Sequence, residues 1–232
     1  MIIRFLYLLA LILPACGTLY AQNKTWIGTT DEWGLDENWS PNGIPESVNS
    51  VIISSGAAAW PKLSEPVEVN SFTMTPGSQI DVKGQKLTSK GAVNLTGATV
   101  YSSETGPAVI ETKGGASYLR NSVFANGLDF TATSNATVNE ADDTGPNTYN
   151  GNVKITMAGS GALNFSTGYR SVVNGNLTIE RPATAASGTA NVFTSGAVAS
   201  TGVTGDFTYI NKIDGATTIG GGLSGKTVIA GK

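Results

Sequence analysis

The chain has 232 residues, with 14 lysines and arginines against 17 aspartates and glutamates, no histidine and one cysteine, and only 13% of it is charged. Without histidine it cannot build a Ser-His-Asp triad or a His-ligated zinc site, and we expect neither catalytic residues nor a cofactor. The slight net negative charge argues against nucleic acid as a partner, because binding to phosphates needs a basic surface.

Residues 1–21 are typical of a signal peptide. Arg4 is the only charge before an apolar run over 5–13, and cleavage after Ala21 would leave a chain that begins at Gln22. The apolar run is shorter than the roughly 20 residues that a membrane-spanning helix needs, so we expect no transmembrane segment after cleavage. We therefore expect a secreted or cell-surface protein. The alternative is an outer-membrane lipoprotein, because the segment before Cys16 resembles a bacterial lipobox.

The segment 22–60 holds every tryptophan of the chain, namely Trp26, Trp33, Trp39 and Trp60. Exposed indole rings stack on sugars, so all four are candidate glycan contacts. The alternative is an N-terminal cap, because the open end of a repeat stack needs bulky apolar residues to cover it. We favour the cap and assign 22–60 to a Trp-rich cap module.

From residue 61 onward the sequence predicts short strands separated by glycine, asparagine and serine turns. Apolar and polar residues alternate within them, and no 3.6-residue apolar period is long enough for a helix. The chain is therefore predicted to be all-β. The clearest strands lie at 67–72, 79–82, 92–95, 153–157, 162–165, 177–179 and 207–210, with a further one before the repeats at 51–53.

A repeat organises the region 61–232. The motif at 150–155 recurs at 174–179, an offset of 24 residues, and again at 204–209, with a degenerate copy at 90–95. A period near 24 suits three strands of about five residues plus their turns. We predict a right-handed parallel β-solenoid, or β-helix, of about seven rungs. A β-sandwich with glycine-rich hairpins is the alternative, because its strand spacing is similar.

The densest acidic run, 140–147, offers oxygen ligands that would suit Ca²⁺, but its spacing matches no EF-hand. We expect a solvated loop there and no metal site. Arg120, Arg170 and Arg181 lie in the repeat region. Arg170 and Arg181 are 11 residues apart, less than one rung, so they need not share a face, and the acidic residues are scattered. Because glycoside hydrolysis needs a fixed pair of carboxyls, we predict that the protein is not an enzyme.

Two segments resemble a known family. The order Trp26, Gly28, Trp33, Asn38–Ser40, Pro45 resembles the opening module of large secreted, cell-surface β-solenoid repeat proteins of Bacteroidota. The segment 147–153, Asn-Thr-Tyr-Asn-Gly-Asn-Val, resembles their rungs. The resemblance implies an adhesin-like protein, exported across the outer membrane by the type IX system, of which this chain would be the N-terminal portion.

The expected function is therefore that of a non-enzymatic secreted or cell-surface structural, adhesin-like protein. Its expected partners are surface glycans or other components of the cell envelope. A carbohydrate-binding or polysaccharide-processing module is the alternative, because the tryptophans or one face of the rungs could contact a sugar.

Overall fold

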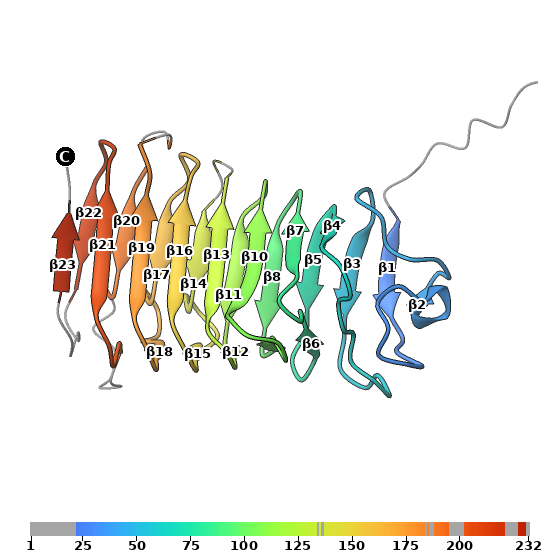
Figure 1. Ribbon diagram of the computed structural model, residues 1–232. Coiled ribbons are helices and arrows are strands. Elements are labelled where there is room, and N and C mark those ends of the chain that lie inside the picture. Colours follow the sequence, from blue (N-terminus) through green and yellow to red (C-terminus); the bar gives the residue numbers. More distant parts are fainter. Residues whose placement is uncertain are drawn as a thin grey trace, which may run out of the picture.

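Figure 1 shows a column of stacked β-strands in a computed structural model that describes residues 22–133, 135, 137–183, 185, 188–194, 202–220 and 227–230. The predicted signal peptide, including Cys16, lies outside the described residues. Helix within them is confined to η1 (Asp36–Asn38), a single 3-10 turn. None of the described segments forms a helix long and apolar enough to cross a membrane.

The strands form three sheets. The ten-stranded sheet contains, in spatial order, β2 (Trp39–Ser40), β1 (Asn23–Trp26), β3 (Ser50–Ile53), β5 (Ser71–Met74), β8 (Val93–Thr96), β11 (Ser117–Arg120), β14 (Val138–Glu140), β17 (Leu163–Phe165), β20 (Ala190–Val192) and β22 (Thr217–Ile219). The eight-stranded sheet contains β4 (Val67–Val69), β7 (Lys86–Ser89), β10 (Ala108–Thr112), β13 (Leu128–Ala132), β16 (Val153–Met157), β19 (Leu177–Arg181), β21 (Phe207–Asn211) and β23 (Thr227–Ala230). The five-stranded sheet contains β6 (Gln79–Asp81), β9 (Thr99–Tyr101), β12 (Val123–Phe124), β15 (Thr148–Tyr149) and β18 (Val172–Val173).

The chain visits the three sheets in turn, for example through β8, β9 and β10 and then through β11, β12 and β13, and we call one such circuit a rung. Strands of successive rungs pair in parallel. This arrangement is a β-solenoid, as predicted, and excludes the β-sandwich, whose sheets are antiparallel. The eight-stranded sheet contributes one strand to each of about eight rungs, one more than expected. The right-handed sense of the coil stays a prediction.

Three of the four predicted copies of the repeat occupy equivalent positions. The copies that end in β16, β19 and β21 stack directly, with Val153 opposite Leu177 and Leu177 opposite Phe207. The copy at 90–95 leads instead into β8 of the ten-stranded sheet, so its place in the same series is wrong. The reason is physical, because a glycine turn followed by alternating residues is needed wherever the chain turns a corner into a strand.

The core lies inside the coil. Residues alternate along each strand, so that in β16 Val153 and Ile155 are buried while Lys154 is exposed. Side chains of the same inward position stack from rung to rung, and the rings of Phe124 and Tyr149 lie 4.8 Å apart at an interplanar angle of 11°. Burial of each such ring contributes about 1.5–3 kcal/mol to the free energy of folding, and the stacked apolar side chains hold neighbouring rungs together.

The Trp-rich segment belongs to the same stack. β1 pairs in parallel with β3, and β3 with β5, so the first strands continue the ten-stranded sheet. Glu32 bridges Lys62, which in turn bridges Asp81 of β6, so the five-stranded sheet continues as well. The strand pairing therefore continues across the boundary predicted at residue 60. β2 departs from the solenoid pattern, because it returns antiparallel to β1 along the outer edge of the sheet.

Candidate functional site

The structure brings three of the four tryptophans into one buried cluster. The side chain of Trp39 lies between those of Trp26 and Trp33, in edge-to-face contacts with ring centroids 4.9 and 4.7 Å apart. These three residues are only 2%, 4% and 1% exposed for Trp26, Trp33 and Trp39, while Trp60 is partly buried against the same core. Stacking on a sugar needs an open ring face, which the three buried indoles do not offer.

The polar edges of two indoles are also occupied. Nε1 of Trp26 donates to the carbonyl oxygen of Ala59 at 2.8 Å, and Nε1 of Trp39 donates to that of Trp33 at 2.8 Å. Gly28 has φ +56, and a Cβ there would lie 2.3 Å from the Ala59 oxygen. The Trp-x-Gly motif therefore has a structural reason, because only glycine leaves room for this indole-to-carbonyl hydrogen bond.

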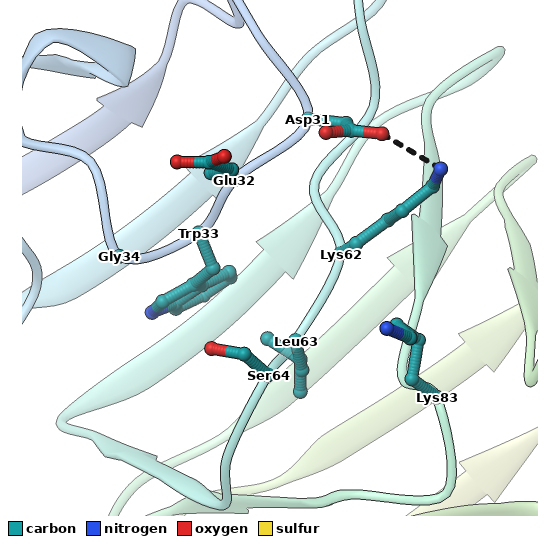
Figure 2. Close-up of a pocket in the computed structure, with 8 residues that line it drawn as sticks. All are labelled: Asp31, Glu32, Trp33, Gly34, Lys62, Leu63, Ser64 and Lys83. Carbon is teal, nitrogen blue, oxygen red and sulfur yellow. Dashed lines mark ion pairs between the residues drawn. The ribbon is translucent and has the colours of Figure 1, made fainter.

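A cleft of about 520 Å³ opens beside the tryptophan cluster, where the first turns of the chain stack on one another (Figure 2). Its lining combines both signs of charge with apolar surface, and comprises Asp31, Glu32, Trp33, Gly34, Lys62, Leu63, Ser64 and Lys83. The backbone bridge between Glu32 and Lys62 shows that the charged residues of the cleft come from adjacent rungs. Of the four candidate tryptophans, Trp33 alone lines this cleft.

One ion pair dominates the electrostatics of this cleft. Nζ of Lys62 lies 2.7 Å from Oδ2 of Asp31, and each side chain is 45% exposed. The hydrogen bond from Lys62 holds the pKa of Asp31 below its ordinary value, and the same bond raises the pKa of Lys62. Asp31 therefore stays ionised and can accept hydrogen bonds, but a carboxyl in this state does not suit the general acid of a glycosidase.

The acidic run 140–147 is held by protein contacts. Asp142 receives a bidentate hydrogen bond from Arg120, at 2.6 Å from Nε and 2.8 Å from Nη2, and Asp143 lies 2.9 Å from the same Nε. The guanidinium also lies 3.9 Å above the ring centre of Tyr118. Arg120 therefore binds its own loop. No cluster of three or more acidic, histidine or cysteine side chains that could hold a metal ion occurs within the described part of the chain.

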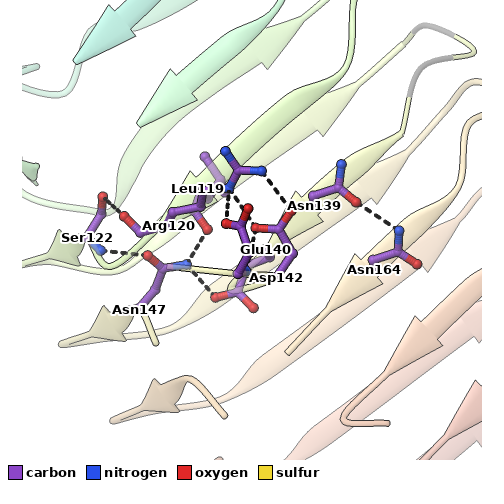
Figure 3. Close-up of polar contacts among 9 residues, drawn as sticks. Leu119, Arg120, Ser122, Asn139, Glu140, Asp142, Asn147 and Asn164 are labelled. Carbon is purple, nitrogen blue, oxygen red and sulfur yellow. Dashed lines mark hydrogen bonds and ion pairs between the residues drawn. The ribbon is translucent and has the colours of Figure 1, made fainter. Parts of the chain in front are cut away.

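Glu140, at the start of that run, lies inside the core and is 0% exposed (Figure 3). Its Oε1 accepts hydrogen bonds from Nδ2 of Asn147 at 2.6 Å, from the Tyr149 hydroxyl at 3.0 Å and from the Ser171 hydroxyl. Its Oε2 accepts from the backbone N–H of Ser166 at 2.8 Å. Burial raises the pKa of this carboxyl, against the opposing effect of hydrogen bonds led by that of Ser171. The expectation of a solvated loop is therefore wrong at Glu140.

Asn147 links Glu140 to a ladder of side chains at one corner of the coil. The backbone N–H of Ser122 donates to Oδ1 of Asn147 at 2.7 Å, and that of Asn147 donates to the Ser171 hydroxyl at 2.9 Å. One rung earlier, the N–H of Ala98 donates to the Ser122 hydroxyl at 3.2 Å. Each rung thus supplies an acceptor for the one before it. Sequence reasoning missed this ladder, although the spacing of 24 or 25 residues matches the repeat.

A second ladder runs along the outer face of the ten-stranded sheet. The side-chain amide of Asn164 donates to Asn139 at 2.8 Å (Figure 3). The side-chain amide of Asn191 donates to Asn164 at 2.9 Å. Of the other two arginines in the repeat region, Arg181 lies at the end of β19 and is 1% exposed. Neither feature presents a reactive group to solvent.

A scan against protein-family models and searches of curated proteins and of solved structures find no match to this chain.

Proposed function

We propose that this chain is a non-enzymatic protein of the bacterial cell envelope, secreted or held at the cell surface, in which the β-solenoid serves as a stiff, adhesin-like extension. The observation that carries the proposal is the continuity of the ladders, because backbone pairs, apolar files and polar side chains all bond rung to rung. Each rung then supports its neighbours, and the length grows by about 4.8 Å per rung.

The state of the charged groups supports a role without catalysis. The carboxyl with the raised pKa, Glu140, is enclosed in the core, where no substrate can reach it. The carboxyl groups of Asp31 and Asp142 are paired with Lys62 and Arg120, so each is held ionised by a neighbouring cation. A catalytic site needs the opposite arrangement, in which a carboxyl of raised pKa meets the substrate.

We further propose that the tryptophan cluster is a cap. Trp26 and Trp39 bury their rings at the N-terminal end of the ten-stranded sheet, and β2 lies antiparallel along the outer strand. A short antiparallel strand with a following proline, Pro41, leaves little backbone open for pairing with another chain. The resemblance of this segment to the opening module of Bacteroidota surface proteins agrees with such a role.

The location is tested by protease treatment of intact cells that express the protein with an internal epitope tag. We expect the epitope to be removed from intact cells, and deletion of residues 1–21 to keep it in the cytoplasm. A Cys16→Ser variant separates the two export forms, because only a lipoprotein would lose its membrane anchor. Protection of the epitope in intact but not in lysed cells would contradict the proposed surface location.

A test of the alternative polysaccharide-processing function uses the purified protein. We expect incubation with soluble xylan, mixed-linkage β-glucan or polygalacturonate to release no reducing ends and no unsaturated products. Release that is lost in a variant of one cleft residue, such as Glu32→Gln, would assign the cleft of Figure 2 to catalysis and would overturn the non-enzymatic proposal.

A further inference from the structure

A shallow groove of about 210 Å³ lies on the outer face of the eight-stranded sheet, where the chain turns into its strands. It crosses three successive strands, β13, β16 and β19, which lie side by side in Figure 1. Its lining combines polar and apolar surface, and comprises Pro107, Leu128, Asp129, Asn152, Val153, Lys154, Asn176 and Thr178. The groove is separate from the cleft beside the tryptophans.

Two asparagines at the edge of this groove are held in fixed orientations. Oδ1 of Asn152 accepts the backbone N–H of Asn176 at 2.9 Å, and Oδ1 of Asn176 accepts that of Asp206 at 2.8 Å. Both asparagines are exposed. Because the amide oxygens are bound to the next rung, the amide nitrogens turn away from it, and neither donates to another residue that the structure describes. The groove thus carries two oriented donors that need little further ordering to bind a ligand.

A second file of polar groups runs beside these donors. Asp129 lies opposite Lys154, and Lys154 lies opposite Thr178, all on the outward side of adjacent strands. Nζ of Lys154 is 3.8 Å from Glu180, whereas the carboxylate of Asp129 takes part in no ion pair among the described residues. Acceptors and donors therefore alternate along the groove. The row of asparagines and the row of Asp129, Lys154 and Thr178 both repeat at the spacing of the rungs, about 4.8 Å.

We propose that this groove binds a linear, neutral polysaccharide that lies along the axis of the solenoid. Groups that repeat from rung to rung suit a polymer whose own units repeat, and the spacing is close to the length of one sugar residue. Hydroxyl groups can both accept from Asn152 and Asn176 and donate to Asp129. A nucleic acid would need a basic surface, and this chain has 14 basic against 17 acidic residues. The proposal rests on the adhesin part of the proposed function.

The test is the double variant Asn152→Asp, Asn176→Asp. A carboxylate oxygen at each position still accepts the N–H of the next rung, but the outward donor is lost. In native gels that contain soluble mixed-linkage β-glucan or xylan, we expect at least one of the two to slow the migration of the protein. We expect the double variant to bind that glycan about tenfold more weakly, the loss that two hydrogen-bond donors would cause.

The matched control is Asn139→Asp, which makes the same change on the ten-stranded sheet and also keeps an oxygen that accepts from Asn164. We expect it to bind like the wild type. Absence of binding to both glycans, equal binding by the double variant, or binding to polygalacturonate alone would each overturn the proposal. None of these results contradicts the proposed role as a stiff extension at the cell surface, because that role is tested by the location of the protein.

Discussion

Replacement of Glu140 by glutamine changes one buried oxygen to an NH₂ group while it keeps the size of the side chain. Both oxygens of Glu140 now accept from N–H groups that can only donate, namely the backbone of Ser166 at 2.8 Å and Nδ2 of Asn147 at 2.6 Å. Glutamine must therefore turn its own NH₂ toward one of them. Two donors that face each other in the core leave at least one without an acceptor.

Asn147 cannot relieve this conflict by a flip of its amide. Its Oδ1 accepts the backbone N–H of Ser122 at 2.7 Å, and its Nδ2 also donates to the carbonyl oxygen of Leu119 at 2.7 Å. After a flip, Nδ2 of Asn147 would face the N–H of Ser122, and Oδ1 would face the carbonyl oxygen of Leu119, so neither hydrogen bond could form. One buried donor without a partner costs about 1–3 kcal/mol, which we take as the destabilisation that the hydrogen bonds predict for Glu140→Gln.

The pH dependence gives this prediction a sign. Burial raises the pKa of Glu140 above 4.5, its ordinary value. The stability that protonated Glu140 contributes is fully present below pH 4.5 and is lost as the pH rises through the pKa of the folded state. Glutamine does not titrate, so the stability of the variant does not fall in this way as the pH rises. The difference in free energy of unfolding between the wild type and the variant is therefore smaller at neutral pH. We therefore expect Glu140→Gln to be more destabilising at pH 4 than at pH 7, relative to the wild type.

The assay is denaturant unfolding of the purified chain, without residues 1–21, at both pH values. Glu104→Gln is the control, because Glu104 is exposed and its replacement should change the free energy of unfolding by no more than about 0.5 kcal/mol. If Glu140→Gln matches this control at both pH values, the described donors do not fix the two oxygens, and the reasoning fails.

Three further predictions concern other parts of the coil. Trp39→Ala should lower the free energy of unfolding by about 3–5 kcal/mol, measured by denaturant titration, and a loss below 1 kcal/mol would contradict its place in the core. Asp142→Asn should lower the free energy of unfolding by about 1 kcal/mol at neutral pH, because the bidentate contact with Arg120 is lost. That contact lowers the pKa of Asp142, so the variant and the wild type should differ in melting temperature above pH 3.8, and the difference should vanish as the pH falls below that value. Asn164→Ala breaks both contacts of the outer ladder and should cost about 1 kcal/mol, whereas an unchanged melting temperature would show that the ladder does not stabilise the sheet.

The repeat was predictable because it lies in local sequence. The motif before Val153 and Leu177 combines a glycine turn with alternating residues, and its offset of 24 residues is the length of one rung there. The next rung is longer, since 30 residues separate Asn176 from the stacked Asp206. Of the six additional residues, three fall between β19 and β20 and three between β20 and β21, and the strand register does not change.

Glu140 was not predictable in the same way. In the strand Val138–Glu140 alternation places its side chain inward, but an isolated carboxyl at an inward position is too costly to bury without donors. Asn147 and Tyr149 supply two of those donors from 7 and 9 residues away. The others come from Ser166 and Ser171, which lie 26 and 31 residues further along the chain. Nothing near Glu140 in the sequence indicates that they will be adjacent. The sequence alone predicts a solvated loop, because only the stacking of the rungs brings these groups together.

The boundary predicted at residue 60 lies where the tryptophans end and the composition of the chain changes. Pairing, however, depends on the backbone, and the bridge between Glu32 and Lys62 joins the two sides of that boundary. A change in side-chain type therefore marks a change in what fills the core, and not a change of fold.

The corner ladder of Ser122, Asn147 and Ser171 has a consequence for the order in which the chain can be assembled. In each step the acceptor comes from the later rung and satisfies a backbone N–H of the earlier one. A chain that folds from its N-terminus would therefore complete the corner hydrogen bonds of each rung only when the next rung has formed.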